Sequence, residues 1–92
     1  MILIVAYDLH NPGRDYPKVK AALEASDGGF VHPQGSVWLI DTADEPAVWR
    51  DRLGAAGDPN DEFLVIRLQH NWASRRMDKG AVQWLKDPRR RW

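Results

Sequence analysis

Cysteine is absent from the 92-residue sequence. This absence excludes disulfide bonds, and the chain has no Cys/His cluster that could bind a structural zinc ion. A chain of this length buries only about 60–65% of the surface that its unfolded form exposes, so the core of the fold is thin. Because oligomerisation is the remaining common supplement to a thin core, we expect a homodimer.

A net charge is also lacking, since 13 Lys and Arg residues balance 13 Asp and Glu residues. A neutral chain has no overall field that attracts nucleic acid, so an anionic partner must be bound by a local basic patch. Two groups of residues are candidates for a nucleic-acid-binding patch: Arg75, Arg76 and Lys79 in the last predicted helix, and Arg89, Arg90 and Arg91 before Trp92.

Long apolar runs are missing as well. The apolar start of the chain spans residues 1–6, which is too short for the core of a signal peptide or for a membrane span. We therefore expect a cytoplasmic protein without a membrane partner. The sequence also lacks a Gly-x-Ser-x-Gly elbow, a phosphate-loop lysine motif and a His-Glu-x-x-His pair, so the common enzyme classes that these motifs mark find no support.

Strand and helix patterns alternate along the chain. Residues 2–7 form a continuous apolar run of strand length, which predicts a central strand covered on both faces. Apolar residues then recur at helical spacing and predict a helix over 16–26, with Asp15 as its cap and Pro17 in its first turn. Residues 30–32 and 36–40 are extended, as a hairpin or as one kinked strand.

The second half of the chain repeats this alternation. A second helix is predicted to begin near Thr42, where Thr42 and Glu45 fit a capping box, although Pro46 suggests a slightly later start. A turn at residues 58–61 precedes a strand over 63–68. The last helix is predicted over 72–86, because its apolar residues follow helical spacing and Pro88 stops it.

This order of elements predicts an α+β fold. The simplest arrangement is ferredoxin-like, of βαββαβ type, with a mostly antiparallel sheet, helices packed on one face and an additional C-terminal helix. We expect one domain over residues 1–88 and a short basic tail over 89–92. A doubly wound parallel sheet would need more units and usually a glycine-rich loop after the first strand, where this chain has only Gly13.

The residues around the first strand carry a family resemblance. Tyr7-Asp8 at the end of that strand, Arg14, and the later motif Gln34-x-Ser36-Val37-Trp38 resemble the CRISPR-associated spacer-acquisition endoribonuclease family, the smaller of the two adaptation proteins. The chain is more closely similar to the small SinR-like family often grouped with it. That pattern is matched by Tyr7-Asp8-Leu9, Pro12-Gly13, Tyr16-Pro17, His32, residues 36–40, Asp61 and Trp72-Ala73.

The resemblance implies roles for three residues. In the CRISPR-associated homodimers the aspartate that matches Asp8 faces its symmetry mate and helps to bind a divalent metal, Mg²⁺ or Mn²⁺. A metal held by one Asp8 per chain is chemically reasonable, because Mg²⁺ needs only one or two protein carboxylates. Arg14 would then clamp a phosphate oxygen, and Ser36 would donate a hydrogen bond near the site.

Each of these residues also has a structural interpretation. Asp8 can accept backbone N–H bonds in the turn that follows the strand, and Arg14 can pair with Asp15 or Asp8 on the surface. Ser36 can satisfy the backbone of its own strand. The catalytic site of Asp8, Arg14 and Ser36, with Asp8 as metal ligand, is therefore a hypothesis with a plain alternative at every position.

Two functions follow. The first, which we favour, is a non-catalytic dimer that binds RNA, DNA or a protein partner. The alternative is a metal-dependent phosphodiesterase, an endoribonuclease or DNase built around Asp8. Binding is favoured because the chain is predicted to finish in a helix and a basic tail, whereas the endoribonuclease pattern ends in a strand that reaches the partner subunit.

Overall fold

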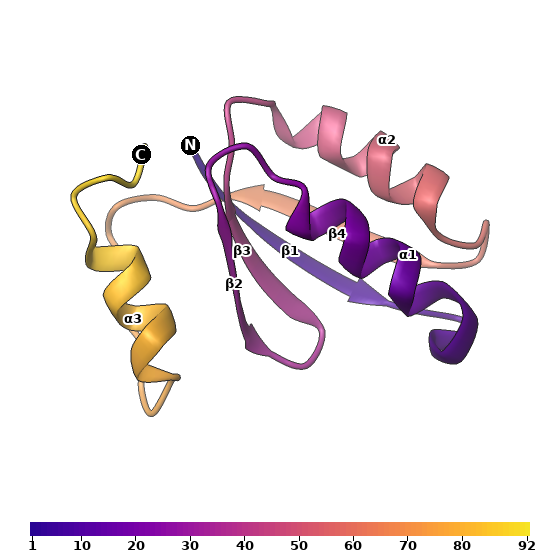
Figure 1. Ribbon diagram of the computed structural model, residues 1–92, viewed down its shortest axis with the longest axis horizontal. Helices are drawn as coiled ribbons and strands as arrows, with labels where there is room; N and C mark the ends of the chain where they lie inside the picture. The colour runs from indigo at the N-terminus through magenta and orange to yellow at the C-terminus, as the bar shows by residue number, and fades with distance from the viewer.

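The computed structural model describes residues 1–92 as an α+β fold, in which three helices pack on a four-stranded sheet (Figure 1). The elements are β1 (Ile2–Asp8), α1 (Pro12–Glu24), β2 (Phe30–Gln34), β3 (Val37–Asp41), α2 (Pro46–Ala56), β4 (Glu62–Arg67) and α3 (Lys79–Lys86). The strand order is β2-β3-β1-β4, and all three pairings are antiparallel. The predicted central position of the first strand is confirmed, and residues 30–41 form a hairpin.

Helices α1 and α2 lie side by side on one face of the sheet, which we call the helix face (Figure 1). Alternate residues of β1 and β3 point to this face, as the period of a strand requires. They include Leu3, Val5 and Trp38, which form the main core with Val19 of α1 and Trp49 of α2. The indole N–H of Trp49 donates to the Thr42 hydroxyl at 3.1 Å, so this core tryptophan buries no unpaired donor.

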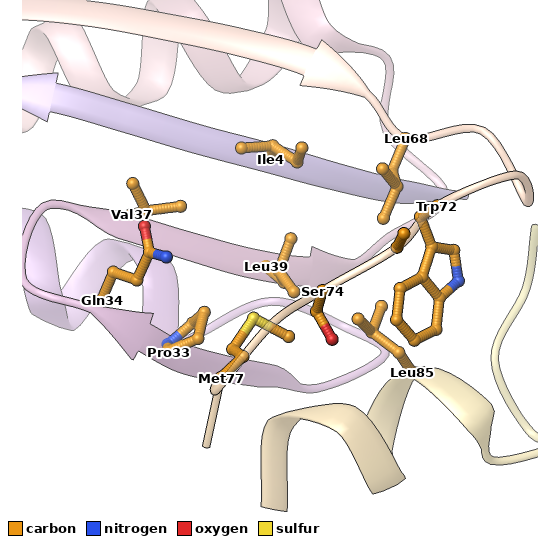
Figure 2. Close-up of a pocket in the computed structure, with 11 residues that line it drawn as sticks. Ile4, Pro33, Gln34, Val37, Leu39, Leu68, Trp72, Ser74, Met77 and Leu85 are labelled. Atoms are coloured by element: carbon orange, nitrogen blue, oxygen red, sulfur yellow. The ribbon is translucent and has the colours of Figure 1, made fainter. Parts of the chain in front are cut away.

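The opposite face of the sheet, the far face, is covered only in part. Ile2 and Leu39 are buried there against Leu85 of α3. An apolar cavity of about 150 Å³ remains between the sheet and residues 72–85 (Figure 2). Leu64 and Ile66 of β4 lie beyond this cover and are 58% and 48% exposed.

The first helix begins earlier than the sequence predicts. It begins at Pro12 with Asn11 as N-cap, whereas Asp15 was predicted as the cap. Pro12 fits the first helical position, where a backbone N–H is not needed. Asp15 lies one turn inside the helix, where its side chain is buried and accepts a hydrogen bond from Arg14 at 3.1 Å.

The last helix is shorter than predicted, because residues 72–78 are not helical. Arg76 has a φ of 58°, a left-handed conformation that breaks a right-handed helix. Asp78 then caps α3, since its carboxylate accepts the N–H of Ala81 at 3.0 Å. Trp72 and Met77 still pack toward the far face, so the apolar spacing that suggested a long helix reflects their burial in an irregular segment.

None of the three helices is long and apolar enough to cross a membrane.

Candidate functional site

An open hollow of about 520 Å³ lies where β1 ends, next to the start of α1 and the β2–β3 turn. Its lining includes Asp8 and Ser36, together with the rings of Tyr7 and Tyr16. The main-chain N–H of Tyr7 donates to the Ser36 carbonyl at 3.1 Å, which fixes the turn beside the end of β1. Two of the three predicted catalytic residues are therefore brought together in one hollow.

The Asp8 carboxylate does not stabilise the turn that follows it. Its side chain is exposed and takes part in no hydrogen bond or ion pair with the rest of the chain. The N–H of His10 in that turn donates instead to Asp61, at 2.6 Å, from the loop between α2 and β4. Asp61 also accepts the N–H of Asp58 at 2.7 Å. The turn-forming role considered for Asp8 thus belongs to Asp61, and the Asp8 carboxylate is free.

A second carboxylate lies next to Asp8. Glu62 is its partner in the antiparallel register of β1 and β4, and both side chains are exposed. Directly opposed residues of an antiparallel pair have Cβ atoms about 4.5–5.5 Å apart. The structure contains no group of three or more His, Cys, Asp or Glu side chains arranged around a metal position. Asp8 and Glu62 provide two carboxylates, and Mg²⁺ is commonly bound by one or two protein carboxylates together with water and substrate phosphates.

Tyr7, which lines this hollow, belongs to an aromatic network that extends into the fold. The indole N–H of Trp38 donates to the Tyr7 hydroxyl at 3.0 Å, and that hydroxyl lies 3.4 Å from the Gly35 carbonyl. His32 stacks on Trp38 with ring centroids 4.2 Å apart. Burial raises the pKa of Tyr7, although the hydrogen bond from Trp38 acts in the opposite direction. Tyr7 is therefore a neutral hydrogen-bonding group at neutral pH and carries no charge toward a ligand.

Arg14, the third predicted catalytic residue, does not line the hollow. Its Nε donates to Asp15 at 3.1 Å, and its terminal nitrogen pairs with Asp58. These hydrogen bonds, first of all the one to Asp15, raise the pKa of Arg14. The surface pairing considered for Arg14 is therefore what the structure contains, and its charge is balanced by two carboxylates.

The basic residues just before α3 and at its first position have no such partners. Arg75, Arg76 and Lys79 are all exposed, and none of them takes part in an ion pair. Lys86, at the end of α3, is also exposed and unpaired. These four residues, which we call the basic surface, are free to contact an anion.

The three arginines of the C-terminal residues 89–92 do not project as a free tail. Arg90 and Arg91 both approach the buried carboxylate of Asp41, at 3.8 and 3.0 Å. Arg89 pairs with Asp87 at 2.6 Å. The side chain of Arg90 is only 8% exposed, so it has little surface left for a phosphate group. Arg89 and Arg91 keep 80% and 47% of their side chains exposed, so the predicted nucleic-acid contacts of this segment stay a prediction for these two residues.

Charge is divided between two parts of the chain despite its overall neutrality. Residues 67–92 contain eight of the 13 Lys and Arg residues but only two of the 13 Asp and Glu residues. The remaining residues 1–66 carry the opposite excess. Ion pairs of Arg90 and Arg91 with acids of residues 1–66 offset part of this positive excess.

Two residues of this region, Glu62 and Asp61, were not predicted as site residues from the sequence. The alternation of residues along 62–67 gives the side on which Glu62 lies but not the register that pairs it with Asp8. The hydrogen bond from His10 to Asp61 joins residues 51 positions apart, and no local pattern encodes it.

Comparisons of the chain with protein-family models, with curated proteins and with solved structures find no match.

Proposed function

We propose that this protein binds nucleic acid without cleaving it, through the basic surface of Arg75, Arg76, Lys79 and Lys86. The observation that carries the proposal is the absence of ion-pair partners for these four side chains, in a chain whose other arginines are mostly paired. Unpaired lysine and arginine side chains release counterions when they neutralise phosphates, which favours binding. The predicted contacts at Arg75, Arg76 and Lys79 are kept in this proposal, and those at Arg14 and Arg89–Arg91 receive less weight.

The test is equilibrium binding of single-stranded RNA and duplex DNA at several salt concentrations. The triple variant R75Q/R76Q/K79Q should bind at least about tenfold more weakly, since each lost phosphate contact contributes on the order of 0.5–1 kcal/mol. The matched control is K18Q/K20Q/R50Q, which removes three exposed cations from α1 and α2 and should bind as the native protein does. Equal affinity of both variants would remove the basic surface from the proposal.

We further propose that the fold is ferredoxin-like and that the chain is related to the SinR-like and CRISPR adaptation families. The βαββαβ order of the first six elements and the strand order support this assignment, together with Asp8 and Ser36 in one hollow. A cytoplasmic homodimer is part of the proposal. Its support is the thin core and the exposed apolar side chains of Leu64 and Ile66 on the far face.

A second candidate function is metal-dependent phosphodiester hydrolysis at Asp8. It is favoured by one observation, namely that the Asp8 carboxylate is free and lies opposite Glu62 at the edge of the hollow. These two carboxylates would hold Mg²⁺ or Mn²⁺. The bound metal would activate a water molecule and neutralise charge on the phosphate. Ser36, in the same hollow, would donate a hydrogen bond to the substrate.

A nuclease assay with Mg²⁺ or Mn²⁺ separates the two functions. If the second function is correct, native protein cleaves RNA or DNA, Asp8→Asn does not, and Glu62→Gln cleaves more slowly. The control is Glu45→Gln, which neutralises an exposed carboxylate at the start of α2. Equal cleavage by native protein and Asp8→Asn would exclude Asp8 from catalysis and leave the binding proposal intact.

A further inference from the structure

A second hollow, of about 450 Å³, lies between the C-terminal end of α3 and the segments on either side of this helix. This volume is within the range of about 300–1,000 Å³ that small-molecule sites occupy. Its lining combines aromatic rings with charged side chains, and consists of His70, Trp72, Leu85, Lys86, Asp87, Pro88, Arg90 and Trp92. We call it the α3 hollow; it is separate from the hollow that contains Asp8.

Aromatic rings form two walls of the α3 hollow. His70 and Trp92 are stacked, with centroids 4.4 Å apart and planes inclined by 13°. Trp72 is shared with the apolar cavity of the far face, and its indole nitrogen points away from that cavity (Figure 2). The indole N–H groups of Trp38 and Trp49 both have acceptors inside the fold. Those of Trp72 and Trp92 have none, so both remain available to a ligand.

The charge that is left uncompensated in this lining is positive. Asp87 is paired with Arg89, and Arg90 lies beside the Asp41 carboxylate. The ammonium group of Lys86 has no ion-pair partner. The side chain of Arg90 also lines this hollow, and its Nε–H is buried without an acceptor. An anion in the hollow would therefore meet a net positive environment.

The walls are held in place before any ligand arrives. The guanidinium group of Arg67 donates to the main-chain oxygen of Trp92 at 2.5 Å. Arg90 donates to the Gly28 carbonyl at 3.0 Å, and its guanidinium lies 4.3 Å from the centroid of Trp84. A preformed site avoids the entropic cost of ordering flexible segments on binding.

From these observations we infer that the α3 hollow binds an aromatic base linked to a phosphate, of the size of one nucleotide. The base lies against the indole of Trp72 or Trp92, where stacking and the free N–H groups contribute to binding. The phosphate lies at the Lys86 ammonium group. The ligand is either a free mononucleotide or one unpaired nucleotide of a single strand, and this chemistry is the same in both cases.

The test uses the indole N–H signals in proton–nitrogen NMR spectra of the ¹⁵N-labelled protein. Adenosine monophosphate at millimolar concentration should shift the signals of Trp72 and Trp92 and leave those of the buried Trp38 and Trp49 in place. Ribose 5-phosphate and adenosine, which each lack half of the ligand, should bind at least about fivefold more weakly. A single-stranded oligoadenylate serves as the second arm, because a shift with the oligomer alone identifies an unpaired base of a strand as the ligand.

Variants make the inference falsifiable. Lys86→Gln should weaken binding of adenosine monophosphate about five- to tenfold and leave adenosine binding unchanged, since the lost contact is to the phosphate. Lys18→Gln on α1 is the matched control. Trp72→Ala also removes packing against the far face, so exposed His70→Ala provides a second aromatic variant. Absence of Trp72 and Trp92 shifts with both ligands would overturn the inference, even if the oligomer still binds the basic surface as proposed above.

Discussion

At the residue scale, the buried carboxylate of Asp41 organises much of the charge in this fold. Its side chain is 2% exposed and accepts hydrogen bonds from both the main-chain N–H and the Nε of Arg91, at 3.1 and 3.0 Å. The α-amino group of Met1 lies 3.9 Å away, and Arg90 lies 3.8 Å away. Removing one member of such a buried group leaves the others with uncompensated charge.

We therefore predict that Asp41→Asn destabilises the protein by about 3 kcal/mol. The measurement is the free energy of unfolding from urea titration. Asp44→Asn is the control, because Asp44 forms an exposed pair with Arg52 and its loss should cost no more than about 0.5 kcal/mol. Similar losses in the two variants would mean that Asp41 contributes no more than a surface ion pair.

Two further aspartates give the fold a dependence on pH. Desolvation raises the pKa of Asp61, but hydrogen bonds from the N–H groups of Asp58 and His10 outweigh it and hold the pKa below the ordinary 3.8. Hydrogen bonds from Arg89 hold the pKa of Asp87 far below 3.8. Both groups bind protons more readily in the unfolded chain, so their contribution is complete above the unfolded pKa and is lost as the pH falls through the folded pKa.

The expected result is a free energy of unfolding that decreases as the pH falls below about 4. Urea titrations at neutral and acidic pH measure this decrease. The double variant D61N/D87N should show a smaller decrease than the native protein, because neither side chain can then take up a proton. An unchanged pH dependence in this variant would assign the effect to other carboxyl groups.

At the scale of elements, β4 is the strand with the least cover. Its residues alternate between the core on the helix face and solvent on the far face, where Leu64 and Ile66 are exposed.

If a second copy of the chain covers this face, Leu64→Lys should convert the homodimer to a monomer. Sedimentation equilibrium measures the change. Val48→Lys on α2, which also replaces an exposed apolar residue, should leave the oligomeric state unaltered.

The elements themselves were largely predictable from the sequence, and the errors lie at their ends. The apolar run at residues 2–7 predicted β1 to within one residue, because a buried strand needs little beyond continuous hydrophobicity. The start of α3 was misplaced because Trp72 and Met77 contribute to the same apolar surface as the helix without being helical. The candidate site was predictable only in part. Ser36 joins Asp8 through the sheet pairing, whereas Arg14 is held away by Asp15 of its own helix and by Asp58 of the loop before β4.

At the scale of the whole molecule, the number of free cations sets the salt dependence expected for the proposed nucleic-acid binding. If only the four unpaired cations of the basic surface contact phosphates, the logarithm of affinity for a single strand should fall against the logarithm of salt concentration with a slope of about −3. If all eight cations of residues 67–92 contact phosphates, the slope should be steeper, at about −6. Affinities measured across a salt series decide between these values. The steeper slope would mean that Arg89–Arg91 leave their internal partners on binding.

The ion pairs around Asp41 also bear on how the chain folds as it is synthesised. β3 supplies the carboxylate early, yet the guanidinium groups that neutralise it belong to residues 90 and 91. Until about fifty further residues have been synthesised, the nascent chain therefore has only the α-amino group of Met1 near this carboxylate at the end of β3. The contacts of residues 90 and 91 with Asp41 can therefore form only late in synthesis, long after β3 has been made.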